Sequence, residues 1–217
     1  MSNMPVNEKD QLVATQLAYA HLNTAVAEII QNRSMQTKND PITVDEALEY
    51  ALNNDIQLFS ETQRFFSLDE NGKVKYEDGY EHIANWEILS AVDDKGNTGF
   101  AACILDTGDA RILACRGSES MEDLLNLKED WVEADLMLLN SEMTKQEGAL
   151  ANYMRENAAL LSERPWVSTG HSLGGALADF AAVMSVELTD RDGNKIGINN
   201  YSGTINFDGP NHSFEFQ

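Results

Sequence analysis

Apolar residues recur at three- and four-residue spacing near the start of this 217-residue chain. This spacing predicts one helix over residues 8–33, with Asn7 as its N-cap. We expect a second helix after Thr43, because Thr43 and Glu46 fit the pattern of a capping box. Residues 73–80 are polar and contain glycine, which predicts an exposed loop. This part of the chain therefore predicts helices that pack on a core, and we assign no chemistry to it.

The periodicity changes at Trp86. Three short apolar runs separated by turns predict an antiparallel meander over residues 86–92, 98–105 and 110–115. Cys103 and Cys115 fall in neighbouring strands of this meander, where a cross-strand contact is one alternative. We predict two buried free thiols instead, because two cysteines in a chain of this length are no disulfide scaffold.

The remaining patterns alternate between helix and strand. Helical patterns cover residues 121–139 and 144–162, and a second capping box, Thr144 with Glu147, predicts the start of the latter. A strand before residue 170, a helix to about Glu187 and a strand at 203–207 follow. This order predicts an α/β fold with a parallel sheet at its centre. We place a boundary at residues 85/86, with an N-terminal helical region before it.

Composition gives more information about the function of the chain than about its fold. The chain has 36 acidic and 15 basic residues and a net charge of −21. Such a surface repels phosphate groups, so we expect no nucleic-acid partner. We find no signal peptide and no transmembrane span, which predicts a soluble protein that is cytoplasmic or secreted without a signal. Residues 190–201 fail the pattern of a calcium-binding EF-hand loop, and we expect a turn and no metal there.

The strongest chemical signal is the stretch Gly170-His171-Ser172-Leu173-Gly174-Gly175. It lies between an apolar run and a small-residue helical pattern, which is the strand–turn–helix context of a nucleophile elbow. Glycines two before and two after the serine let neighbouring segments approach closely. We predict that Ser172 is a catalytic nucleophile. The alternative is a glycine-rich turn with an incidental serine.

Taken together, these segments resemble the class 3 lipases, the fungal-type triacylglycerol lipases and their bacterial lipase-like relatives. The resemblance covers about residues 86–210. Its segments are Gly99-Phe100-Ala101, Arg116-Gly117-Ser118, Asp130-Trp131, Gly170 to Gly175 and Asn206-Phe207-Asp208-Gly209-Pro210. It implies an α/β-hydrolase fold that hydrolyses acyl esters, with lipid or phospholipid among the substrates, and it implies no cofactor.

The resemblance also implies an oxyanion hole. The residue after Arg116-Gly117 supplies a donor in the family, and that residue is Ser118 here. The backbone N–H of Leu173, next to the nucleophile, is the expected second donor. His171 is typical of lipase elbows, and we interpret it as structural.

A serine nucleophile needs a base and an orienting acid, which follow it in the chain order of α/β-hydrolases. The candidate pair within this chain is Asp208 with His212, the single histidine after Ser172. We expect instead that the chain is a fragment, and that a missing C-terminal segment supplies the acid and the base. A thioesterase, an acyltransferase or a non-catalytic hydrolase-like module stay open as functions.

Overall fold

A computed structural model describes eight stretches of the chain, with side chains of the long helix before β6 described from Met143 onward. The described residues are 4–20, 22–33, 40–56, 58, 65–94, 98–117, 133–190 and 192–207. The elements in chain order are α1 (Glu8–Leu17), α2 (Leu22–Asn32), α3 (Val44–Asn53), β1 (Phe66–Leu68), β2 (Val74–Tyr76), the 3-10 helix η2 (Glu81–Asn85), β3 (Glu87–Asp93), β4 (Ala101–Asp106), β5 (Arg111–Cys115), α5 (Glu133–Glu156), α6 (Ala158–Ser162), β6 (Trp166–His171), α7 (Leu173–Glu187) and β7 (Tyr201–Phe207).

One mixed sheet of five strands organises the described chain, in the order β3-β4-β5-β6-β7. The strands β3, β4 and β5 pair antiparallel, which confirms the predicted meander. The strands β5, β6 and β7 pair parallel, so the C-terminal ends of these three lie at one edge of the sheet. The predicted loop at 73–80 was partly wrong, because β2 pairs there with β1 in a small antiparallel hairpin.

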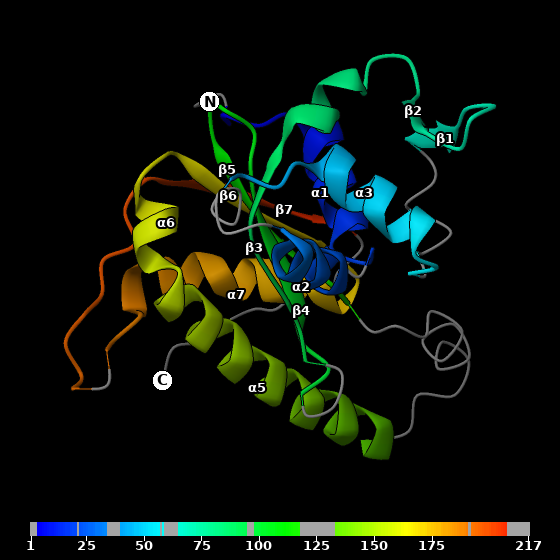
Figure 1. Ribbon diagram of the computed structural model, residues 1–217. Coiled ribbons are helices and arrows are strands. Elements are labelled where there is room, and N and C mark those ends of the chain that lie inside the picture. Colours follow the sequence, from blue (N-terminus) through cyan, green and yellow to red (C-terminus); the bar gives the residue numbers. More distant parts are fainter. Residues whose placement is uncertain are drawn as a thin grey trace.

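Helices cover both faces of the sheet (Figure 1). Side chains alternate along the strands, so Leu105 and Ile112 pack with the N-terminal helices while Ile104 and Leu113 pack with α5 and α7. A central sheet between helices, with an N-terminal helical set on one face, confirms the α/β-hydrolase-like fold expected from the sequence. Within the residues described, no helix is both long and apolar enough to cross a bilayer.

The two cysteines are buried free thiols, as predicted. They lie on adjacent strands but are not opposite each other, because Cys103 pairs with Ala114 and Cys115 pairs with Ala102. Their side chains belong to different clusters, on the two faces of the sheet. Burial raises the pKa of the Cys103 thiol from 9.0 to about 12, which keeps it protonated and unreactive near neutral pH.

The prediction of one helix over residues 8–33 was wrong. The chain forms α1 and α2, separated by a turn at residues 18–20. The residues from Leu17 to Ala20 are all buried, and consecutive residues of a straight surface helix cannot all face the core. The break resolves this conflict, because α1 lies on β5 and β6 while α2 lies on α3 and β3. The predicted caps Asn7 and Thr43 are confirmed, since each side chain accepts a backbone N–H three residues on.

The predicted helix start at Thr144 was also wrong. Instead, α5 runs unbroken through this position, from Glu133 to Glu156. Buried residues continue along one face of α5, at Met143, Gln146, Leu150 and Met154. Packing of this face against α7 overrides a local capping pattern, because burial of several side chains outweighs one cap.

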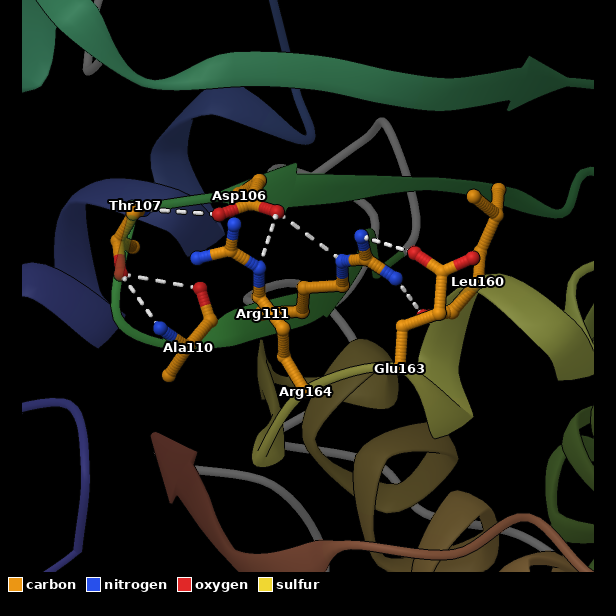
Figure 2. Close-up of polar contacts among 8 residues, drawn as sticks. Asp106, Thr107, Ala110, Arg111, Leu160, Glu163 and Arg164 are labelled. Carbon is orange, nitrogen blue, oxygen red and sulfur yellow. Dashed lines mark hydrogen bonds and ion pairs between the residues drawn. The ribbon is translucent and has the colours of Figure 1, made fainter.

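The N-terminal ends of β5 and β6 carry a network of ion pairs, shown in Figure 2. The Nε atom of Arg111 donates to Asp106 at 3.1 Å, and its Nη2 atom donates to Glu163 at 2.8 Å. Another guanidinium nitrogen of Arg111 donates to the Leu160 carbonyl. Arg164 approaches the same Asp106 carboxylate at 3.4 Å. The network ties the turn between β4 and β5 to the segment that leads into β6.

Candidate functional site

Ser172 lies between the last residue of β6 and the first residue of α7. Its backbone angles are φ 56° and ψ −128°, in the left-handed half of conformational space that L-residues avoid. Holding a serine there costs about 1–3 kcal/mol, so the surrounding contacts must enforce it. This is the sharp strand-to-helix turn that the sequence predicted.

Two backbone hydrogen bonds hold this turn. The N–H of Ser172 donates to the Phe207 carbonyl of β7 at 2.9 Å. The Ser172 carbonyl accepts the N–H of Gly175 at 2.9 Å, which begins the first turn of α7. Since β7 pairs with β6 up to His171 opposite Phe207, the turn is fixed from the neighbouring strand as well as from its own helix.

Close packing of the backbone requires glycine on both sides of Ser172. A Cβ on Gly170 would lie 2.1 Å from the Gly174 carbonyl oxygen, and a Cβ on Gly174 would lie 2.3 Å from the Cys115 carbonyl oxygen. Both contacts are with backbone, which has nowhere to move. The start of α7 therefore rests directly on the ends of β5 and β6, and the two glycines in the pattern make this approach possible.

The N-terminus of α7 can stabilise negative charge next to Ser172. Leu173 is the first residue of the helix, and the first N–H groups of a helix have no partner within it. The helix dipole adds partial positive charge at the same end. Leu173 itself is buried. A backbone donor beside a serine hydroxyl, at a water-poor helix start, is suited to an oxyanion.

The segment after β5 lies against the nucleophile elbow at Ser172. Arg116 is buried and makes a bidentate pair with Asp93, at 3.0 and 3.1 Å. The next residue, Gly117, is in contact with the elbow, since a Cβ there would lie 2.7 Å from the His171 carbonyl oxygen. Its N–H donates to the Tyr19 hydroxyl at 3.0 Å. The predicted oxyanion residue Ser118 is the next in sequence and lies outside the described residues.

The predicted acid and base, Asp208 and His212, also lie outside the described residues. Among the described residues, Asp179 and His82 have partners other than Ser172. Asp179 on α7 accepts a 2.7 Å hydrogen bond from the Asn206 side chain. His82 pairs with Asp10 of α1 at 2.9 Å.

The acidic loop after α7 is a turn, as expected. The Asn194 side chain donates to Asp190, and so do the backbone N–H groups of Asn194 and Asp192. These hydrogen bonds lower the pKa of Asp190. Across the part of the chain that the structure describes, His, Cys, Asp and Glu side chains form no cluster of three or more that suits a metal ion.

Sequence reasoning gave no role at the site to two residues that the structure places near the elbow, Asn206 and Tyr19. Asn206 faces α7 closely enough that its side-chain oxygen lies 2.0 Å from the position of a Cβ on Gly175. Tyr19 approaches through Gly117, 98 positions further along the chain. Tyr19 has no local signal, because it fits the apolar pattern of the predicted helix. Asn206 belongs to a segment that resembles the class 3 lipases, but that resemblance assigned it no role. Only the pairing of distant segments gives them a place at the site.

One family of known proteins matches the part of the chain that contains Ser172. The sequence model of the family described as lipase (class 3) matches residues 112–204, a little under half of the chain. The match begins in β5 and ends in β7, so it includes Ser172 and its flanking strand and helix. No curated protein matches the chain.

Three of the solved structures to which the chain is similar are fungal proteins. They are the nonglycosylated LIP2 lipase of Yarrowia lipolytica (TM-score 0.40, 16% identity, 58% of this chain and 47% of that chain), a mutant form of MDLA from Penicillium cyclopium (0.38, 17%, 82% and 57%) and a lipase from Rhizopus microsporus var. chinensis (0.36, 16%, 93% and 58%). The chain thus spans about half the length of these structures.

The match of residues 112–204 confirms the resemblance found in the sequence: over these residues, the chain is similar to the class 3 lipases.

Proposed function

We propose that this chain carries a serine ester hydrolase site in which Ser172 attacks the carbonyl carbon of an acyl ester. The observation that carries the proposal is the backbone of Ser172, held at φ 56° between a strand and a helix N-terminus. The match to class 3 lipases over the same segment supports it. A merely structural turn would have no need of a serine in a conformation that glycine adopts at lower cost.

The chemistry proceeds in two steps. The Ser172 Oγ atom bonds to the acyl carbon, its proton passes to a base, and the ester C–O bond breaks to release an alcohol. The base gives its proton to the leaving alcohol oxygen. A water molecule then attacks the acyl-enzyme and loses a proton to the base, which passes it to the Ser172 Oγ atom as the carboxylic acid product leaves. Both steps pass through a tetrahedral oxyanion, for which we propose the Leu173 N–H and Ser118 as donors.

The reaction also needs a base and an acid that orients it. Within this chain we propose His212 as the base and Asp208 as its orienting acid. The alternative is an acid and a base from a segment beyond this sequence. The change His212→Gln separates the two, because loss of the base lowers kcat by orders of magnitude, whereas an uninvolved histidine leaves it unchanged.

The proposed substrates are acyl esters, with uncharged lipids and short soluble esters favoured over anionic phospholipid surfaces. The net charge of −21 supports this preference, because it opposes approach to a negatively charged membrane. Fold-level similarity does not select one ester among these.

Hydrolysis of p-nitrophenyl butyrate tests the proposal. We expect turnover by the chain and a fall of about 10⁴-fold or more in Ser172→Ala. The matched control is Ser185→Ala, since Ser185 lies on the same helix and its hydroxyl donates to the Ala182 carbonyl of that helix at 2.7 Å. Equal activity in wild type and Ser172→Ala would exclude Ser172 as the nucleophile. Absent activity in wild type would favour a non-catalytic module.

A further inference from the structure

We propose that Tyr19, from the N-terminal helical region, is a positioning residue for the Ser172 site. Its hydroxyl fixes the N–H of Gly117 and thereby the backbone that touches the nucleophile elbow. The inference rests on the proposed function, and it assigns a role in catalysis to a region for which the sequence indicated only packing.

The contact is buried and specific. The Gly117 N–H donates to the Tyr19 hydroxyl at 3.0 Å, and both residues are almost fully removed from solvent. The strand β5 ends at Cys115, and the following N–H, that of Arg116, still bonds to the Ala101 carbonyl of β4. Gly117 is the first residue past this pairing. A buried backbone N–H without a partner is costly, so the tyrosine hydroxyl takes over where the sheet ends.

Gly117 is in direct contact with the elbow. A Cβ at this position would lie 2.7 Å from the His171 carbonyl oxygen, 2.8 Å from the Tyr19 hydroxyl and 3.3 Å from the Gly174 nitrogen. From the other side, a Cβ on Gly174 would lie 2.8 Å from the Gly117 nitrogen. The backbones on both sides of Ser172 are therefore packed against the one amide that Tyr19 holds.

The position of Tyr19 is itself well fixed. It lies in the turn after α1, where its N–H donates to the Gln16 carbonyl at 3.0 Å. The preceding helix is bonded to β6 through Thr15, whose hydroxyl lies 3.0 Å from that of Thr169. The break between α1 and α2 thus places a phenol on the sheet at the end of β5, on the face opposite α7. A side chain held in this way can keep an active-site backbone in one geometry.

The test compares Tyr19→Phe with Tyr50→Phe. Both changes remove one hydroxyl from the N-terminal helical region and keep the ring. Tyr50 bonds to Glu28 at 3.0 Å and to Asn32 at 2.9 Å, within the helices and away from the elbow. Activity is measured as kcat per Ser172 titrated with a fluorophosphonate, so that a smaller folded fraction does not count as slower chemistry.

We expect Tyr19→Phe to lower kcat per titrated site about tenfold with KM changed less than twofold, because one hydrogen bond that fixes the reacting geometry is lost. Tyr50→Phe should leave both constants within twofold. Amide hydrogen exchange at Gly117 should become about tenfold faster in Tyr19→Phe and stay unchanged in Tyr50→Phe.

Equal kcat in the two variants, unchanged exchange at Gly117, or unfolding of Tyr19→Phe would overturn the positioning role. The last would show that the hydroxyl serves the fold as a whole. The proposed function fails differently, through absent hydrolysis or activity that survives Ser172→Ala, and Gly117 exchange can be measured even then.

Discussion

The two ends of β5 and β6 are held differently. At their N-terminal ends, long charged side chains meet, with Arg111 between Asp106 and Glu163 (Figure 2). At their C-terminal ends there is one buried ion pair, Arg116 with Asp93, and glycines let backbone lie on backbone, with Ser172 held at positive φ. The same strands thus end in an adaptable side-chain network on one side and in a rigid arrangement of main chain on the other.

This difference separates stability from function. An ion-pair network tolerates small shifts, because side chains can adjust to keep their partners. At the elbow, an added Cβ would lie only about 2–3 Å from backbone atoms, so the packed main chain there tolerates no small shift. This rigidity suits a site whose reacting atoms must keep their geometry. We therefore expect changes at the polar end to alter the free energy of unfolding, and changes at the elbow end to alter activity as well.

The largest expected effect is at Gly174. In Gly174→Ala the new methyl would lie 2.3 Å from the Cys115 carbonyl oxygen, so α7 must move away from β5. We expect a loss of about 2–3 kcal/mol in the free energy of unfolding and a fall of at least about 100-fold in kcat. Urea unfolding and ester hydrolysis measure the two effects.

Gly148→Ala is the matched control. Gly148 lies within α5 and has no atom within 4 Å of an added Cβ. Alanine there should stabilise the protein by about 0.5–1 kcal/mol with unchanged kcat. If both alanines behaved alike, the close packing at the elbow would not be the reason for its glycines.

The next effect is at the polar end. Arg111→Ala leaves the buried Asp106 carboxylate without its nearest cation, and we expect it to cost about 3 kcal/mol of unfolding free energy. Because the site lies at the other end of the strands, kcat per titrated Ser172 should stay within twofold. Thermal unfolding and active-site titration provide the measurements.

Glu163→Gln is the mild version of the same change. The Glu163 side chain is 60% exposed, so its pair with Arg111 should contribute less than about 1 kcal/mol. A drop in kcat per site for Arg111→Ala as large as that for Gly174→Ala would remove the distinction between the two ends.

A smaller effect, which depends on pH, is expected on the free energy of unfolding from Cys103 in the middle of β4. The pKa of the Cys103 thiol is raised by burial from 9.0 to about 12, so above pH 9 the unfolded chain loses this proton while the folded chain keeps it. The stabilisation is complete below about pH 9 and is lost as the pH rises toward 12, by about 1.4 kcal/mol per pH unit. Urea unfolding at pH 9.0 and 10.0 with reductant should show a shallower decline in Cys103→Ala. Identical slopes would mean that the thiol is accessible to water.

The sequence predicted best what is encoded locally. The elbow has its serine, its glycines and its flanking strand and helix within a few residues, so their pattern alone indicated the turn. The caps at Asn7 and Thr43 are equally local, and the structure confirms both. The meander was predictable because its strands are neighbours in the chain.

Long-range packing decided the features that sequence reasoning missed. The turn at 18–20 exists because α1 and α2 pack on different elements, and α5 continues past Thr144 because its buried face continues. The Tyr19–Gly117 hydrogen bond joins residues 98 positions apart. Nothing within a short window of sequence records such a pairing. The acid and base of the proposed site, Asp208 and His212, stay predictions.

Mapping the adduct of a fluorophosphonate probe tests the central claim most directly. The intact chain would be incubated with the probe, digested, and analysed by mass spectrometry, with heat-unfolded protein as the control. The account predicts one modified residue, Ser172, only in the folded chain. Modification of a different serine, equal labelling after unfolding, or no adduct would contradict the assignment of Ser172 as the nucleophile.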